Sequence, residues 1–380
     1  MNFSKSKQHT GSIRLAGLLL LSVLYGCLEP TKPEFQLEDG FFLIEGSILE
    51  GEGQGEIRIR ASDFRDVVLQ FESVEGAEVL AVKADGTTVS WIQGYEPGRY
   101  IPPAGAVALA GETWHFEINL PDGTSVTSAP ETIPAPVEVS NLAINFVQNS
   151  TFDEGLNRFV PRFELFLDYE DPADQANFYA YDYRYWEEIT ICVSCENGRW
   201  RDGVCIPFNE TPRFPVRYDY LCDTQECFAT KEGNETRYGT DAFSNGSSLT
   251  GFPIGGIEFS AYGGMLVEGS VYSITKAAFD YGKVIQDLVE GNSGLNPTIP
   301  AALNGNVRNV NPSGRDVLGF IGAASKGDSR AFVNRTTETG SPLPFDNSLR
   351  LEPIPPPGVP PRAPCDILGV RTSDRPIGWP

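Results

Sequence analysis

The cysteines have the most evident chemistry in this chain of 380 residues, and there are seven of them. One ends the sequence Leu24-Tyr25-Gly26-Cys27, where an aliphatic residue, a tolerant position and a small residue precede the thiol. This order is typical of a lipobox: a narrow peptidase pocket accepts the small residue, and the sulfur takes the lipid. We therefore expect cleavage before Cys27 and lipidation of Cys27. The alternative is an ordinary signal peptide that is cut elsewhere.

The segment before Cys27 has the composition of an export signal. Lys5, Lys7 and Arg14 give it a positive start, and an apolar run follows at residues 15–24. This run is too short to cross a bilayer as a helix, because a spanning helix needs about 20 residues. We predict a signal peptide at residues 1–26 and a polar tether at residues 27–37. A lipid anchor would then hold the rest of the chain at a membrane.

The other six cysteines, an even number in an exported chain, favour structural disulfides. Five of them fall within residues 192–227, so one region would be stapled locally. The sequence leaves the pairing open. A redox motif or half of a zinc site is the alternative for the first two, but the sequence lacks a βαβ context and suitably spaced partner ligands. The six are Cys192, Cys195, Cys205, Cys222, Cys227 and Cys365.

Carboxylates are dense around one predicted turn, and their oxygens could bind calcium. The glycine and the distal glutamate of an EF-hand loop are missing, so a solvated turn is the favoured interpretation. Paired acids of a glycosidase are also conceivable, but acid pairs are too common in this chain to indicate such a site. The calcium candidates are Asp168, Glu170, Asp171 and Asp174.

Tyrosines alternate along residues 177–190, which places them on one face of a predicted strand. Aromatic faces can stack on sugars or line a peptide groove, so this row is a candidate ligand face. Cross-strand packing within a sheet is the competing interpretation and the more common role. The row consists of Tyr179, Tyr181, Tyr183 and Tyr185.

The sequence lacks the residues that most catalytic mechanisms require. Beyond the signal peptide the chain has one histidine, His115, and no G-x-S-x-G, P-loop or G-x-G-x-x-G motif. The net charge is −22, and removal of the three positive charges of the signal peptide makes it −25. Such an acidic chain repels nucleic acid phosphates and anionic lipids. We expect no enzymatic activity, no cofactor and no nucleic acid partner.

The elements that would carry these residues are mainly β-strands. Residues 38–134 show short alternating strands, with turns at Asp85-Gly86 and at Pro121-Asp122-Gly123, and no helical pattern. This spacing predicts an immunoglobulin-like β-sandwich. A proline-rich linker at residues 129–136 would end it.

Residues 135–380 predict a larger β-rich domain with one long helix and a disulfide-stapled loop region. Apolar residues at helical spacing place the helix at about residues 271–290, with Ser270 or Ser273 as its cap and Gly291 at its end. Residues 317–323 predict a buried strand. A proline-rich segment at residues 353–364 would lead to Cys365, which pins the tail.

Short sequences at matching places along the chain resemble a family of outer-membrane lipoproteins of Bacteroidetes-type bacteria, domain of unknown function 4249. Residues 74–79, 85–86 and 97–100 are similar to its N-terminal sandwich, and residues 171–179 to the entry into its second domain. The helix near residues 272–288 lies where the family has its long helix, but Asp280-Tyr281 replaces the usual Phe-Trp. Residues 304–309 and 317–320 are similar to its most recognisable C-terminal stretch.

The resemblance implies a location more than an activity. Members are thought to lie at the outer membrane and are commonly encoded beside TonB-dependent receptors. It implies a non-enzymatic accessory of a TonB-dependent transporter that captures a ligand or docks, lipid-anchored at the outer membrane and exposed at the surface or facing the periplasm. A stand-alone surface adhesin or glycan-binding protein is the alternative.

Overall fold

Strands dominate the residues that the structure describes. The computed structural model describes residues 40–65, 68–173, 175–189, 191–208, 218–222, 226–234, 236–291, 305–338, 340, 342–343, 351–352, 365 and 369–380. All of them belong to one unit, Gly40–Pro380. The predicted signal peptide, Cys27, the tether, Asp174 and the proline-rich segment lie outside the described residues. Within the described part, no helix is long and apolar enough to cross a membrane.

The N-terminal strands form the two predicted hairpins. Asp85 and Gly86 lie in the turn between β5 and β6, and Asp122 and Gly123 lie in the turn between β9 and β10. In each turn the aspartate side chain accepts a hydrogen bond from the backbone two residues later, which stabilises the turn. The strands are β1 (Phe42–Leu49), β2 (Gly51–Glu52), β3 (Gly55–Arg65), β4 (Val68–Ser73), β5 (Glu78–Lys83), β6 (Thr88–Gln93), β7 (Arg99–Ile101), β8 (Val107–Ala108), β9 (Thr113–Asn119), β10 (Ser125–Ser128) and β11 (Glu131–Thr132).

The core of this N-terminal part includes residues from far along the chain. Strands β23 (Val307–Asn309), β24 (Val317–Leu318) and β25 (Ile321–Asn334) join it: β23 pairs with β10, and β24 and β25 pair in parallel with β1. Their apolar side chains lie in the same buried cluster as those of β1, β3 and β9. The expected boundary at residue 134 therefore does not enclose a complete core, because the last strands of the core follow about 170 residues later.

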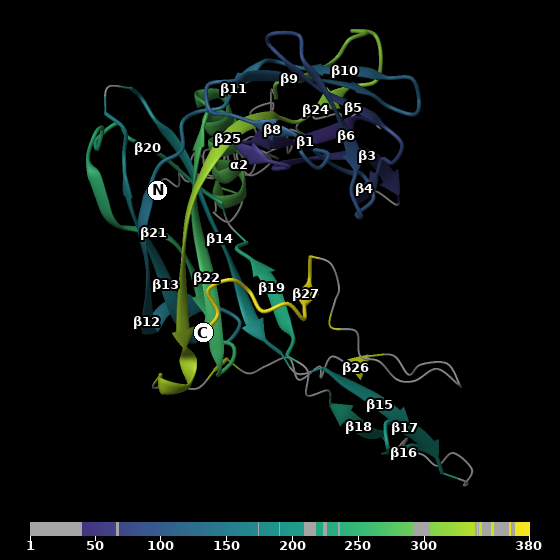
Figure 1. Ribbon diagram of the computed structural model, residues 1–380, viewed down its shortest axis with the longest axis vertical. Helices are drawn as coiled ribbons and strands as arrows, with labels where there is room; N and C mark the ends of the chain where they lie inside the picture. The colour runs from purple at the N-terminus through teal and green to yellow at the C-terminus, as the bar shows by residue number, and fades with distance from the viewer. Residues whose placement is uncertain are drawn as a thin grey trace, which may run out of the picture. The chain divides into compact units, whose positions relative to one another are not determined.

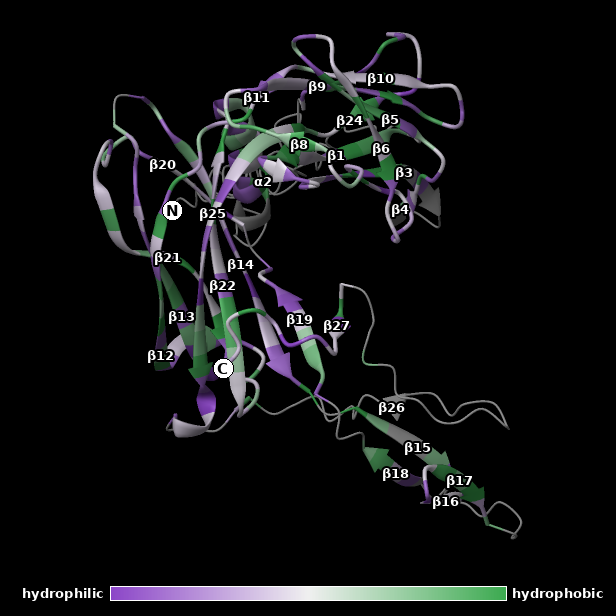
Figure 2. Ribbon diagram, viewed as in Figure 1, coloured by the Kyte–Doolittle hydropathy of each residue, from purple (hydrophilic) through white to green (hydrophobic). Residues whose placement is uncertain are grey.

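The remaining strands form two further layers around a second core. One layer is the sheet β12–β13–β21, and the other contains β14, β22 and β25 side by side, with β19 and β20 along the outer edge of β14 (Figure 1). Figure 2 shows hydrophobic residues along β13, and the side chains that alternate inward from this strand are buried. The strands are β12 (Val139–Asp153), β13 (Arg158–Glu170), β14 (Phe178–Glu188), β19 (Phe228–Glu232), β20 (Arg237–Thr240), β21 (Ser248–Glu258), β22 (Gly264–Ile274) and β27 (Arg371–Thr372).

One strand, β25, belongs to both parts. Its first residues, Ile321 to Ala324, pair with Gly46 to Leu49 of β1. From Ala324 to Asn334 it pairs with β22, so the backbone hydrogen bonds pass from one part to the other without an interruption. The predicted fold class is confirmed at this level: the protein is mainly β, with several sheets, disulfides and one described α-helix.

A close backbone contact holds β24 and β25 against β1. Gly319 has a φ of +119°, and a Cβ placed on it would lie 2.0 Å from the carbonyl oxygen of Ile44. A Cβ on Gly305 would lie 1.6 Å from the carbonyl oxygen of Gly319. The side chain of Asn306 then pairs with the backbone of Ile321 through two hydrogen bonds of 2.8 Å. The predicted strand at residues 317–323 is therefore interrupted, because Gly319 separates β24 from β25.

The predicted helix is present but begins later than expected. It is α2 (Lys276–Gly291), whereas residues 271–274 continue strand β22 between β14 and β25. Backbone pairing on both sides outweighs the helical spacing of Val271 and Ile274. Ser270 and Ser273 therefore do not cap the helix; the hydroxyl of Thr275 accepts a hydrogen bond of 3.2 Å from the Ala278 amide. The helix ends at Gly291, as predicted.

The described residues of the stapled region form several short strands. Cys192 pairs with Cys222, Cys195 with Cys205, and Cys227 with Cys365, so all six cysteines form disulfides. The last bond fixes the C-terminal segment to the start of β19, as expected of Cys365. The elements here are β15 (Cys192–Glu196), β16 (Gly198–Arg201), β17 (Val204–Pro207), β18 (Tyr218–Cys222) and β26 (Leu351–Glu352).

A buried ion pair closes the far end of β14, β22 and β25. Arg335 opens the 3-10 helix η1 (Arg335–Thr337), is 1% exposed and donates to the carboxylate of Glu187 at the end of β14. Its backbone amide also donates to the carbonyl of Gly263, just before β22, over 3.0 Å. Lys231 of β19 reaches the second oxygen of Glu187. Four strand ends are therefore joined through one carboxylate and one guanidinium.

Candidate functional site

The tyrosine row does not form an exposed face. Tyr179, Tyr181 and Tyr183 are 1%, 1% and 7% exposed, and Tyr185 packs against the same buried cluster. The hydroxyl of Tyr181 lies 2.6 Å from that of Tyr169, and the Tyr183 hydroxyl donates to the carbonyl of Gly256 over 2.9 Å. The rings of Tyr179, Tyr181 and Tyr183 fill the space between the two layers and are not accessible to a sugar or a peptide, whereas Tyr185 is half-buried.

Two of the carboxylates proposed for calcium, Asp168 and Asp171, have other partners. Asp168 accepts the Gly251 amide over 2.7 Å and the Asn141 side chain over 3.0 Å, and these hydrogen bonds lower its pKa. Asp171 is buried and accepts hydrogen bonds from the Tyr179 hydroxyl and the Gly246 amide. In the described part of the chain, no group of three or more histidine, cysteine or acidic side chains is placed to hold a metal ion.

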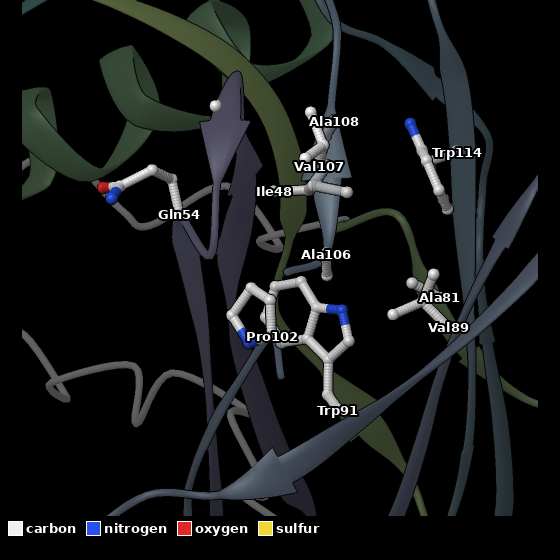
Figure 3. A pocket seen from close by; sticks show the side chains of 11 residues that line it. Ile48, Gln54, Ala81, Val89, Trp91, Pro102, Ala106, Val107, Ala108 and Trp114 are labelled. Carbon is white, nitrogen blue, oxygen red and sulfur yellow. The ribbon is translucent and has the colours of Figure 1, made fainter. Parts of the chain in front are cut away.

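A small cavity lies within the N-terminal core. It has a volume of about 20 Å³ and lies between the rings of Trp91 and Trp114, with short side chains such as Ala81 and Val89 beside them (Figure 3). A single water molecule needs roughly 10–15 Å³ of such volume. The cavity is therefore large enough for about one water molecule and too small for an organic ligand.

A cleft of about 1110 Å³ lies where the two parts share β25. Its floor is the face of β14 and β22 that points away from the tyrosine row. The N-terminal strands β1 and β3 form one wall, and the start of α2 forms another. Binding sites for small molecules commonly have volumes of roughly 300–1,000 Å³, so this cleft can hold a ligand of that size. Asp182 lies on its floor, Arg58 on the β3 wall and Tyr281 on the helix.

The arginines of the wall are already paired with acids. Arg58 and Arg99 contact the carboxylate of Glu56 over 3.0 and 2.5 Å, and Arg99 also lies beside the ring of Tyr95. These side chains are partly exposed, so their mutual attraction is screened by solvent and contributes little to stability. They make the wall polar without leaving an unpaired positive charge on it.

On the same face of the sheet as the floor, one carboxylate is shared by three cations. Glu268 of β22 is 1% exposed and lies 2.9 Å from Arg184, 2.6 Å from Lys326 and 2.6 Å from Arg330. Burial alone would raise the pKa of Glu268, but the hydrogen bonds and charges of Lys326 and Arg184 outweigh it and lower the pKa to about 2. This cluster fixes Arg184 at the edge of the cleft.

The low pKa of Glu268 predicts a component of acid sensitivity. A carboxyl with a folded pKa near 2 and an unfolded value near 4.5 stabilises the fold above about pH 4.5, and this contribution is lost as the pH falls toward 2. The contribution of this carboxylate to the free energy of unfolding is on the order of 3 kcal/mol, and about 2 kcal/mol of it would be lost by pH 3. In Glu268→Gln, we expect the free energy of unfolding in urea to fall less between pH 5 and pH 3 than in the unmodified protein. Glu154→Gln, at an exposed turn, is the control. Equal pH slopes for Glu268→Gln and the unmodified protein would contradict the assignment.

Three tyrosines surround the floor at the α2 end of the cleft. They are Tyr238 of β20, Tyr272 of β22 and Tyr281 of α2, and burial raises the pKa of each, to about 12 for Tyr272 and Tyr281. All three phenols are therefore neutral at physiological pH. Tyr281 stacks on Phe320 at 5.1 Å, and α2 comes close enough to β20 that a Cβ on Gly282 would meet the Tyr238 ring.

The family of the protein follows from comparison with known proteins. A family model for a domain of unknown function, DUF4249, matches residues 29–330. The chain belongs to this family. The resemblance seen in the short motifs is thereby confirmed. No curated protein and no solved structure is significantly similar to the chain.

The region matched by DUF4249 contains nearly all of the cleft. It includes β1, β3, β14, β22, α2 and the part of β25 that lines the cleft, whereas Gly369 lies after it. The recognisable stretch at residues 304–309 and 317–320 contains Gly305, Asn306 and Gly319, which join β24 and β25 to β1. These residues of the matched region therefore maintain the junction at which the cleft lies.

Proposed function

We propose that this chain is a non-enzymatic, lipid-anchored outer-membrane protein that captures a small polar ligand for a TonB-dependent transporter. The cleft of about 1110 Å³, lined by carboxylates, arginines and tyrosines, is the observation that carries the proposal. The lipobox at Cys27 supports the anchor, and the resemblance to a lipoprotein family supports the location and the partner.

The lining favours capture rather than catalysis. Its arginines are paired with acids, its tyrosines are neutral, and none of the cleft residues is a histidine, a cysteine or a serine with a basic partner. Such a surface offers hydrogen bonds and aromatic contacts, which hold and orient a ligand. The alternative of a glycan binder that uses the tyrosine row has lost most of its support, because three of the four tyrosines are buried.

The proposal is tested by closing the cleft. Ala278 of α2 lines it, so a bulky side chain in Ala278→Trp would occupy the space, whereas Ala277→Trp, at an exposed position outside the lining, is the matched control. The lipidated full-length proteins would be extracted from the outer membrane with an uncharged detergent. Small molecules released on denaturation would be identified by mass spectrometry.

We expect a molecule that is retained by the unmodified protein and by Ala277→Trp, and reduced at least tenfold in Ala278→Trp. We also expect a TonB-dependent receptor to co-purify with all three. Equal retention in all three proteins would contradict ligand capture in this cleft. Extraction of only the free protein, while the receptor is present in the membrane, would contradict the accessory role.

A further inference from the structure

The cleft has an imbalance between free acids and free cations. Arg58, Arg99 and Arg184 line it, and each is paired with a carboxylate of the protein. Asp182 and Glu232 also line it. Within the part of the chain that the structure describes, neither acid has a lysine or arginine nitrogen within 4.0 Å. A ligand with a positive group therefore finds unpaired carboxylates, whereas a ligand anion would compete with acids already in place.

Asp182 is the more enclosed of the two acids. It lies near the middle of β14, opposite Ser270 of β22, and is half-buried. One of its oxygens accepts the amide of Tyr183 over 2.7 Å, and the other has no hydrogen-bond donor among the described residues. Burial raises the pKa of Asp182, and the neighbouring Glu232 raises it further, against the opposing charges of Lys326 and Arg184. A carboxylate in these surroundings is stabilised when a cation comes close.

The surroundings of Asp182 suit an organic cation. Tyr238 and Tyr272 lie close enough to Asp182 for its charge to raise the pKa of each phenol, and Tyr281 lies beside Tyr238. Neutral aromatic rings attract ammonium and guanidinium groups through their faces. A divalent metal ion needs several oxygen ligands, and the described residues offer no group of three acidic, histidine or cysteine side chains.

We infer that the cleft binds ligands that carry an ammonium or guanidinium group, with Asp182 as the counter-charge and Tyr238, Tyr272 and Tyr281 as the aromatic surface around it. This inference rests on the proposed capture of a ligand in the cleft and names the chemical class of that ligand. Glu232, which is more exposed, adds a second negative charge toward the open side. Basic peptides and amino sugars carry such groups.

The test uses pairs of probes that differ only in charge. N-acetyl-arginine amide is compared with N-acetyl-citrulline amide, and N-acetyl-lysine amide with its Nε-acetylated form. Each is titrated into the lipidated full-length protein in an uncharged detergent, with binding followed by calorimetry. We expect each cationic probe to bind at least tenfold more tightly than its neutral counterpart.

The variants assign the effect to the site. Asp182→Asn keeps an oxygen for the Tyr183 amide, so it should fold, and its affinity for the cations should fall at least tenfold. Tyr272→Leu should weaken binding about threefold or more, and Glu154→Gln should leave it unchanged. Melting temperatures would verify the fold of each variant.

Equal affinities within the probe pairs, or unchanged binding by Asp182→Asn, would overturn the inference, as would binding of calcium but of neither cationic probe. The two proposals fail in different ways. If Ala278→Trp loses its retained molecule but the cationic probes show no preference, ligand capture stands and the cation class is wrong. If Ala278→Trp retains it, ligand capture in this cleft is itself contradicted.

Discussion

Gly319→Ala is expected to destabilise the protein by about 4 kcal/mol or more. The new Cβ would lie 2.0 Å from the carbonyl oxygen of Ile44 and 2.7 Å from its carbonyl carbon. Backbone atoms cannot move aside as the end of a flexible side chain can, so β1 and β24 would have to separate. Large effects of single substitutions arise from this kind of overpacking combined with backbone strain.

Substitution of a second glycine serves as a control that distinguishes backbone strain from steric conflict. Gly123, in the β9–β10 turn, has a φ of +89°, and a Cβ on it would meet no atom within 4 Å. Gly123→Ala should therefore cost only about 1 kcal/mol, from backbone conformation alone. Urea unfolding followed by circular dichroism measures both. If Gly319→Ala costs no more than Gly123→Ala, the close contact between β1 and β24 is not as described.

Glu187→Gln is expected to lower the free energy of unfolding by about 3–5 kcal/mol. The substitution leaves the guanidinium of Arg335, which is 1% exposed, without its anion in the interior. Burial alone would raise the pKa of Glu187, but the charges of Arg335 and Lys231 outweigh it and lower the pKa overall, so the carboxylate is ionised at neutral pH. The ends of β14, β19 and β25 lose the carboxylate that joins them, whereas the hydrogen bond from the Arg335 amide to Gly263 remains.

A matched pair at the surface provides the control. Arg375 and Glu226 are 2.5 Å apart with both side chains 49% exposed, so Glu226→Gln should cost no more than about 1 kcal/mol. Replacing both buried partners, in Glu187→Leu with Arg335→Met, should recover part of the loss, since it removes the buried charges together. Chemical denaturation of the unmodified protein, of Glu187→Gln and Glu226→Gln, of the single replacements Glu187→Leu and Arg335→Met, and of the double variant measures this. A double variant as unstable as the sum of the two single replacements would show that the two charges are not coupled.

The local elements of the fold could be predicted from the sequence. Asp-Gly turns, alternation along β9 and β13, and the helical spacing of Ala278, Tyr281 and Ile285 all act over a few residues, where local conformation and a single buried face decide the outcome. The start of α2 could not be predicted in this way. Val271 and Ile274 satisfy a helical pattern, but long-range pairing with β14 and β25 keeps them extended.

The cleft could not be predicted from the sequence either, because it too depends on long-range pairing. The alternation that places Tyr179, Tyr181 and Tyr183 on one face of β14 also places Ala180, Asp182 and Arg184 on the other, so the signal was present in the same eleven residues. The aromatic face of β14 has the stronger sequence pattern, but it is the buried face. Which face is open depends on β22, β25 and α2, and no local pattern reveals that. The disulfide partners were equally hidden, since Cys227 and Cys365 are 138 residues apart.

The shared strand β25 has a consequence for the order in which the protein can fold. Strand β1 is made early in synthesis, but its parallel neighbour does not exist until residue 324 has been added. Until then the edge of β1 is an unpaired template for other strands, which makes the growing chain prone to aggregation. A fragment ending at residue 134 should share this weakness. The N-terminal core can therefore be completed only after most of the chain has been made.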